Sequence, residues 1–252
     1  MDRLVNKIIL VAGAGAIGSE LAHRYAREGA SVLVGDIDFA SARAVAEAIA
    51  NEGASATAVP LDGSDERSIV QAIAAGRDIY GGLDGLHVNF AVFERDEADT
   101  GVIGVSLPSF DEQMQVNVRG YFLCTRHALP EIVARGGGAI LYTSSIAAYS
   151  ASKERVGYAM SKAAVLALMR HVASRYGRDG IRANAIAPGY IRSPGQAQFP
   201  GLVERAVEMA MIKSRIGEPG DIASLSALLM SDEGSYITGQ NIAVDGGVTF
   251  RP

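Results

Sequence analysis

Short apolar runs alternate with longer stretches of helical periodicity along most of this chain, and that alternation is what most constrains its fold. The first run, KIILVAG, is apolar throughout, which is typical of a parallel strand covered on both faces. In the next stretch, Ile17, Leu21 and Tyr25 form an apolar stripe on one side of a helix. The whole pattern predicts strands at 7–13, 30–36, 56–62, 83–91, 138–145, 181–189 and 240–246, and helices near 16–28, 39–51, 65–79, 110–135, 154–176 and 219–231.

The repeated strand–helix order predicts a doubly wound α/β fold, with a seven-stranded parallel sheet and helices on both faces in a Rossmann-like arrangement. A chain of 252 residues is long enough to bury a sizeable core, and no polar linker or change of composition divides it. We therefore expect residues 1–252 to form a single domain. Ligands of such sheets bind beyond the carboxyl ends of the strands, so candidate site residues are sought there.

Charge and composition exclude several classes of partner. The net charge is −5 and the pI is about 5.4, so the chain lacks the basic surplus expected of proteins that bind nucleic acid or anionic membranes. Its apolar stretches are interrupted before the ~20 residues of a membrane span, and MDRLVNKIIL lacks the apolar core of a signal peptide. The single cysteine, Cys124, excludes an internal disulfide and favours a reducing compartment. We expect a cytoplasmic protein with no nucleic-acid and no membrane partner.

A glycine-rich segment, VAGAGAIGS, links the first predicted strand to the first predicted helix. Gly13, Gly15 and Gly18 have the spacing G-x-G-x-x-G, which lets backbone amides approach a pyrophosphate at a helix N-terminus. A tight strand–helix turn without a ligand would use the same glycines. The following strand ends at Asp36, eighteen residues after Gly18, and that context favours a dinucleotide.

A carboxylate at the position of Asp36 accepts hydrogen bonds from the ribose hydroxyls of adenosine and repels a 2′-phosphate. Neither 11–20 nor 36–42 contains an Arg or Lys that would bind such a phosphate. The sequence therefore favours NAD over NADP as cofactor. The alternative is that Asp36 is a solvated turn residue.

The segment YAMSK places Tyr158 and Lys162 four residues apart, hence on one face of a predicted helix. A phenol has an ordinary pKa of about 10, and a nearby ammonium lowers it, so the two form a plausible acid/base pair. Many such pairs are only surface neighbours. Ser145 follows a predicted strand, and Asn117 interrupts an apolar helix, where a core Asn bonded to backbone is as plausible as a catalytic one.

Several segments, in this order and at this spacing, resemble the short-chain dehydrogenase/reductase family of the single-domain, Tyr-x-x-x-Lys type. These are MQVNVRG (114–120), SSIAAYSASKERVGYAMSK (144–162), RANAIAPGYIRSP (182–194) and GEPGDIASLSALLMSDEGSYITGQNIAVDGG (217–247). The resemblance extends from about Lys7 to Gly247. It implies an NAD-dependent oxidoreductase that interconverts a secondary alcohol and a ketone by hydride transfer.

The resemblance also implies a catalytic tetrad. Tyr158 would exchange the proton of the reacting oxygen, and Lys162 would lower the pKa of that tyrosine and bind the nicotinamide ribose. Ser145 would donate a hydrogen bond to the reacting oxygen, and Asn117 would hold a water in a proton relay. No metal is implied, and the four histidines show no ligand spacing.

The predicted cofactor contacts combine the glycine-rich segment with the resemblance. They are Gly13, Gly15, Ala16, Ile17, Gly18, Asp36, Ile37, Asp62, Gly63, Asn89, Ala91, Tyr158, Lys162, Pro188, Gly189, Ile191 and Ser193. The chain departs from the family at the first turn, where Ala12 replaces Thr and the loop is one residue shorter, and at Phe90, which adds bulk near the cofactor ribose. Gly15 and Ala16 both remain candidates for the closest backbone approach to the pyrophosphate.

Substrate identity is expected to depend on segments 93–104, 146–156 and 190–212, whose mixed composition suggests a small or medium, mainly apolar alcohol or ketone. Residues 190–212 have the Gly/Pro start and amphipathic continuation of a lid, whereas 93–109 is either a surface loop or a wall of the substrate pocket. The resemblance implies a homotetramer. Rival functions are a noncatalytic NAD-binding regulator or scaffold, a two-domain dehydrogenase, and a lyase or epimerase that retains NAD.

Overall fold

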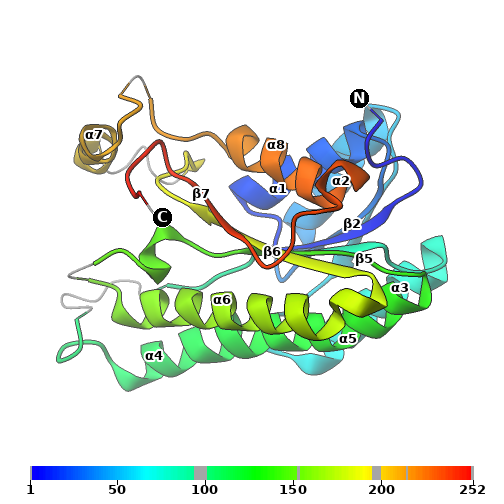
Figure 1. Ribbon diagram of the computed structural model, residues 1–252, viewed down its shortest axis with the longest axis horizontal. Coiled ribbons are helices and arrows are strands. Elements are labelled where there is room, and N and C mark those ends of the chain that lie inside the picture. Colours follow the sequence, from blue (N-terminus) through cyan, green and yellow to red (C-terminus); the bar gives the residue numbers. More distant parts are fainter. Residues whose placement is uncertain (1, 94–100, 152–153, 195–199, 214, 251–252) are drawn as a thin grey trace.

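The computed structural model describes residues 2–93, 101–151, 154–194, 200–213 and 215–250. All seven predicted strands are present and pair in parallel in one sheet of order β3-β2-β1-β4-β5-β6-β7 (Figure 1). Their bounds are β1 Ile8–Ala12, β2 Ser31–Asp36, β3 Ala56–Pro60, β4 Gly85–Val88, β5 Gly138–Thr143, β6 Ile181–Pro188 and β7 Asn241–Val244. The doubly wound, Rossmann-like prediction is confirmed.

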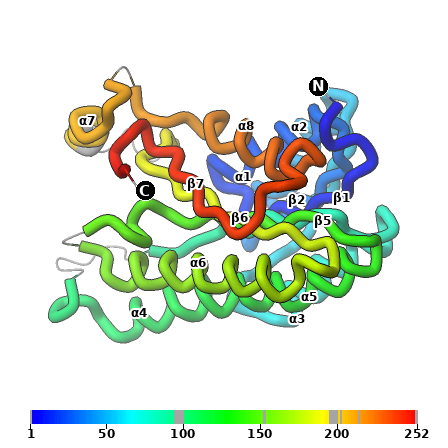
Figure 2. Tube along the Cα trace, in the orientation of Figure 1, coloured from blue at the N-terminus to red at the C-terminus, as the bar shows by residue number. Residues whose placement is uncertain are grey.

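Helices cover both faces of this sheet (Figures 1 and 2). They are α1 Ala16–Arg27, α2 Phe39–Asn51, α3 Glu66–Tyr80, α4 Leu107–Gln113, α5 Tyr121–Ala134, α6 Val156–Tyr176, α7 Pro200–Met209 and α8 Pro219–Met230. One apolar core lies between the sheet and α3, α5 and α6, and a second lies between the sheet and α1, α2 and α8. The strands are buried on both faces because each core takes the alternate side chains of the central strands, which explains their unbroken apolar runs.

The predicted helix at 110–135 is the element that differs most from expectation. Its span contains the end of α4, a π-helical segment η1 (Met114–Gly120) and α5. A π-turn inserts one extra residue into the helical repeat, and such bulges are frequent at functional sites. The segment 190–212 contains α7, while residues 195–199 lie outside the described part of the chain.

The register of the sheet places the predicted site residues at one edge. Ala12 pairs with Gly35 on one side and with Val88 on the other, so Gly13, Asp36 and Asn89 follow directly at the junction of β2, β1 and β4. The strand order reverses between β1 and β4, which is where doubly wound sheets bind ligands. The helix α7 and the chain's C-terminus lie at one end of the molecule (Figure 2).

Candidate active site

Two glycines of the first turn are required by backbone packing. Gly13 has φ +106°, and a Cβ there would lie 2.5 Å from the backbone nitrogen of Phe90. A Cβ on Gly18 would overlap the carbonyl oxygen of Gly13, so a larger residue would push α1 away from the turn. These observations confirm a tight turn and close helix packing at the two outer glycines.

Gly15 differs from Gly13 and Gly18 because no atom of the described residues lies within 4 Å of the position its Cβ would occupy. It precedes the first turn of α1, and no side chain caps that turn. The first amides of a helix have no intrahelical partner, so this N-terminus presents N–H groups and the positive end of the dipole to open space. The cradle fits a pyrophosphate, and the open space at Gly15 would allow one to approach the backbone there.

Asp36, at the end of β2, lies against the glycine-rich turn. Its Oδ2 accepts a hydrogen bond from the backbone N–H of Ala14 at 2.5 Å, and its Oδ1 accepts one from Asp38 at 2.9 Å. The next side chain, Ile37, is 74% exposed. A carboxylate and an exposed apolar side chain therefore stand together beside the cradle, which fits the ribose and base of an adenosine.

The second predicted acidic residue, Asp62, lies beyond β3. Its Oδ1 accepts hydrogen bonds from the backbone N–H of Ser64 at 2.8 Å and from the Ser64 hydroxyl at 2.7 Å. The remaining predicted cofactor residues that are placed by their elements are Ala16 and Ile17 in the first turn of α1, Gly63 after Asp62, Ala91 after β4, and Pro188, Gly189, Ile191 and Ser193 at the end of β6 and beyond it.

Phe90, where the chain departs from the family it resembles, packs its ring against two glycines. A Cβ on Gly63 would lie 2.6 Å from that ring, and a Cβ on Gly120 would lie 3.1 Å from it. The ring also meets Tyr121 edge-on, with centroids 5.2 Å apart and an interplanar angle of 75°. The absence of a side chain at position 63 makes room for the larger residue at position 90, whereas a Cβ on Gly120 would first meet the carbonyl oxygen of Gly63, at 2.3 Å.

Beyond β6, the backbone of the segment predicted to contact the cofactor is held by two neighbours. The N–H of Gly189 donates to the carbonyl of Val244 at 3.1 Å, and Ile191 forms an isolated parallel bridge with Gly217. The N–H of Arg192 donates to the Gly217 carbonyl at 2.8 Å. These bonds fix the path of the chain from β6 toward the segment predicted as a lid.

Asn117 lies in η1, is fully buried and binds backbone on both sides of its amide. Its Oδ1 accepts from the N–H of Val92 at 2.8 Å, and its Nδ2 donates to the carbonyl of Val92 at 2.7 Å and to Ser161 Oγ at 3.2 Å. The side chain thus joins the segment after β4 to α6, one residue before Lys162. Hydrogen bonds to the backbone are typical of an Asn in a protein core, and the π-helical segment η1 places Asn117 at the candidate site. The water relay stays a prediction.

Lys162 is 1% exposed, although it carries an ammonium group. Its Nζ donates to the carbonyl oxygen of Thr143 at 2.8 Å and to Tyr121 Oη at 2.9 Å, and it lies 5.7 Å from the ring centroid of Tyr158. Burial lowers the pKa of Lys162 to about 7, because the charged form loses its hydration. The two residues of the YAMSK segment are therefore close together, as their spacing predicted.

Ser145 and Tyr158 complete the predicted tetrad at the same edge of the sheet. Ser145 follows β5, and its Oγ accepts from the N–H of Ala147, capping the short 3₁₀ turn η2 (Ile146–Ala148), which packs against α6. The half-buried Tyr158 ring meets Phe93 edge-on at 5.5 Å. The four predicted residues stand in η1, in α6 and directly after β5; η1 and η2 both pack against α6, and Lys162 lies beside the Tyr158 ring.

Three contacts of the site were not predicted from the sequence and are seen only in the structure. Tyr121 and the carbonyl of Thr143 hold Lys162, and Ser161 holds Asn117. Tyr121 follows Asn117 by four residues, a spacing that puts both on one helical face. This spacing was the only sequence signal that Tyr121 belongs to the site. A main-chain carbonyl such as that of Thr143 leaves no signal in the residue pattern.

Within the described ranges, no group of three or more His, Cys, Asp or Glu side chains is arranged to hold a metal ion. No helix of the described part has both the length and the apolar character needed to cross a membrane.

Comparison with known proteins gives matches along nearly the whole chain. The family model described as enoyl-(acyl carrier protein) reductase matches residues 11–249. A Bradyrhizobium diazoefficiens protein named "Probable short-chain type dehydrogenase/reductase" is 39% identical over 250 residues, covering 98% of this chain and 89% of that protein. The cyclohexanol dehydrogenase of an Acinetobacter species is 32% identical, covering 99% and 98%. A solved 7α-hydroxysteroid dehydrogenase complexed with NADH and 7-oxo glycochenodeoxycholic acid superposes with a TM-score of 0.90 at 31% identity, covering 97% and 95%.

Proposed function

The chain belongs to the short-chain dehydrogenase/reductase family, and from that premise we propose that it is an NAD-dependent oxidoreductase interconverting a secondary alcohol and a ketone. The observation that carries the proposal is the buried Lys162 ammonium, 5.7 Å from the Tyr158 ring centroid at the ligand-binding edge of the sheet. Relatives named as cyclohexanol and 7α-hydroxysteroid dehydrogenases support the same reaction class.

In the oxidation direction, Tyr158 takes the proton of the substrate hydroxyl as the carbon–hydrogen bond breaks, and in reduction it returns a proton to the carbonyl oxygen. The positive charge of Lys162 favours the phenolate of Tyr158 and lowers the pKa of its phenol. The hydroxyl of Ser145 donates a hydrogen bond to the reacting oxygen and orients it. The nicotinamide, when bound, supplies the hydride acceptor for oxidation and the hydride donor for reduction.

The cradle at Gly15 and the carboxylate of Asp36 would hold the pyrophosphate and the adenosine ribose. We propose NAD rather than NADP because a carboxylate at this position repels a 2′-phosphate and no Arg or Lys occurs at 11–20 or 36–42. The solved 7α-hydroxysteroid dehydrogenase, which is complexed with NADH, supports the choice.

The substrate is proposed to be a mainly apolar alcohol or ketone. Phe93 is 43% exposed and its ring meets the ring of the catalytic Tyr158 edge-on. An aromatic wall beside the proton donor favours alicyclic or other apolar groups at the reacting carbon. Residues 94–100, 152–153 and 195–199, which also belong to the predicted substrate segments, lie outside the described part of the chain.

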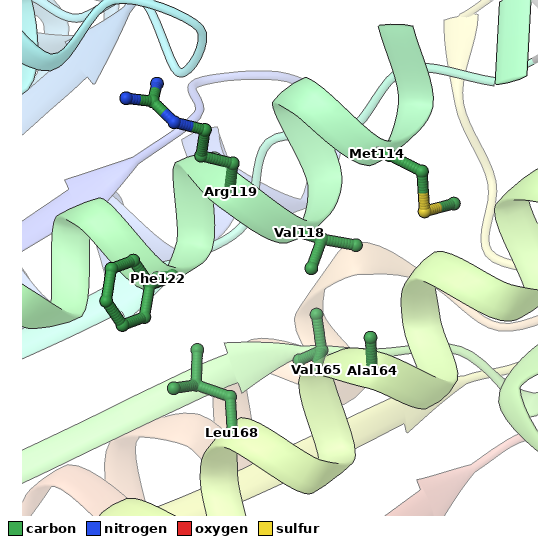
Figure 3. A pocket seen from close by; sticks show the side chains of 7 residues that line it. All are labelled: Met114, Val118, Arg119, Phe122, Ala164, Val165 and Leu168. Atoms are coloured by element: carbon green, nitrogen blue, oxygen red, sulfur yellow. The ribbon is translucent and has the colours of Figure 1, made fainter. Parts of the chain in front are cut away.

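We further propose that copies of this chain associate through the face formed by η1, α5 and α6, as part of a homotetramer. A cavity of about 390 Å³ opens between these helices, with Met114, Val118 and Phe122 facing Ala164 and Leu168 across it (Figure 3). Phe122 is 45% exposed, and a second copy would cover it. Light scattering coupled to size exclusion tests this: Phe122→Glu should reduce the measured mass, and a monomeric unsubstituted protein would overturn the proposal.

The decisive experiment follows the absorbance of reduced cofactor with a panel of secondary alcohols, including cyclohexanol and hydroxysteroids, offered with NAD and with NADP. Turnover with NAD and its loss in Tyr158→Phe, with cofactor binding retained, is the expected result. NAD binding with no turnover of any substrate would instead favour a noncatalytic regulator, and reaction without net NADH formation would favour a lyase or epimerase.

A further inference from the structure

Tyr121 is fully buried at the start of α5, yet its hydroxyl is part of the catalytic cluster. Its Oη accepts a hydrogen bond from Lys162 Nζ at 2.9 Å, and the phenol proton points to backbone carbonyls, those of Phe90 at 2.9 Å and Thr143 at 3.1 Å. The ring itself lies under the ammonium, with the centroid 4.7 Å from Nζ. Tyr121 therefore contacts Lys162 through both its hydroxyl and its ring.

A buried ammonium needs such partners because its hydration is lost. Lys162 has three N–H donors, and the two partners it shows are a carbonyl and a phenol rather than a carboxylate. Among the described residues, the titratable groups that face this cluster are Tyr121 and Cys124 from α5, Tyr142 from β5 and Tyr158 from α6. The phenol of Tyr121 stays protonated, because burial raises its pKa well above its ordinary value, so it serves Lys162 as a dipole and not as a counter-ion.

We propose that Tyr121 is a positioning residue for the catalytic lysine: its hydroxyl holds the Lys162 ammonium in a fixed place, stabilises its charged form, and leaves the third N–H for the site that Tyr158 faces. The inference rests on the proposed function, since it assigns Lys162 the task of favouring the Tyr158 phenolate. Phe90 helps to hold Tyr121 in place: its carbonyl accepts a hydrogen bond from the Tyr121 hydroxyl, and its ring packs against the Tyr121 ring.

Tyr121→Phe keeps the ring under the ammonium and removes only the hydroxyl. Because a hydrogen bond to a charged group is lost, the pKa of Lys162 should fall by about one unit, a ~10-fold change in its protonation constant. With less positive charge beside it, Tyr158 is harder to deprotonate. The pair then holds a smaller share of the form with Tyr158 as phenolate and Lys162 as ammonium, so kcat for alcohol oxidation should fall by up to about 10-fold, while KM changes little.

Tyr142→Phe is the matched control. Tyr142 is equally buried and its ring stacks on Tyr121 at 6.3 Å, but its hydroxyl pairs with Thr125 at 2.9 Å and not with Lys162. The control loses a buried hydroxyl from the same core, so it reports any general loss of stability. Its kcat should match that of the unsubstituted protein.

A second measurement requires no turnover. The Nζ of Lys162 can be titrated by ¹⁵N NMR in the cofactor-free protein, since the chain has only four lysines and Lys162→Met identifies the signal. If no substrate is turned over, the proposed function fails while the titration still decides the role of Tyr121. A titration midpoint and a kcat that are the same in Tyr121→Phe and Tyr142→Phe would overturn the proposal. Should Tyr121→Phe not fold, 3-fluorotyrosine at position 121 weakens the acceptor and should still lower the midpoint; an unchanged midpoint would overturn it.

Discussion

The buried ammonium of Lys162 makes a quantitative prediction about stability. Burial lowers its pKa from 10.5 to about 7 in the folded state, whereas in the unfolded chain the lysine returns to its ordinary value. Between these two values the unfolded state binds more protons than the folded state, so stability rises with pH. Below about pH 6 both states are fully protonated and the contribution of Lys162 is constant.

The size of the effect follows from the shift. Each pH unit well above the folded pKa is worth ~1.4 kcal/mol, and because titration is half complete at pH 7 the change from pH 7 to pH 9 is about 2 kcal/mol. Lys162→Met removes the titrating group and keeps much of the packing. The unfolding free energy of the unsubstituted protein, minus that of Lys162→Met, should therefore grow by about 2 kcal/mol over this range.

Urea unfolding of the cofactor-free protein at pH 6, 7, 8 and 9 provides the assay, with both proteins at one concentration because association also stabilises the fold. Lys213→Met, which removes an exposed lysine, is the control, and its difference from the unsubstituted protein should not vary with pH. A difference for Lys162→Met that stays constant from pH 7 to pH 9, or falls, would refute the buried, desolvated ammonium.

Three further predictions test the cofactor and substrate sides of the site. Asp36→Ala should weaken NAD binding by about 10- to 100-fold and NADP binding less, as measured by fluorescence titration; equal losses would contradict the ribose contact. Gly18→Ala should lower the unfolding free energy by roughly 1–3 kcal/mol, since its Cβ would overlap the carbonyl oxygen of Gly13, whereas Gly177→Ala, where space is open, should not; equal urea midpoints would contradict this. Phe93→Ala should lower kcat/KM by about 10-fold for bulky alicyclic alcohols and little for small ones, and a uniform loss would argue against an apolar wall.

The fold and the proximity of Tyr158 to Lys162 could be predicted because their signals are local. Unbroken apolar runs indicate parallel strands, and Tyr158 and Lys162 lie four residues apart on one helix. Each pattern can be recognised within a short segment of the sequence. The π-turn at Asn117 could not be predicted, because one extra residue in an apolar helix barely changes the periodicity of its apolar residues.

The placement of Phe90 shows the other limit of a single sequence. Its ring depends on Gly63, Gly120 and Tyr121, which are far from it along the chain. Each of those glycines also has ordinary local explanations, a turn or a helix irregularity. That these residues lie close to the Phe90 ring is seen only in the folded structure.

Thr143 links the glycine-rich turn to Lys162 through hydrogen bonds. Its hydroxyl donates to Asn89 Oδ1 at 2.9 Å, and Asn89 Nδ2 donates to the carbonyl of Gly13, while the Thr143 carbonyl accepts from Lys162. A hydroxyl has one proton, so the Nε2 of His87, 3.0 Å away, must be the donor to Thr143 Oγ1. Burial lowers the pKa of His87 to about 3, so the ring is neutral and its Nδ1 accepts the proton of Tyr25 Oη. The donor and acceptor of each of these hydrogen bonds are thereby assigned. A shift of β5 would disturb the glycine-rich turn and Lys162 together.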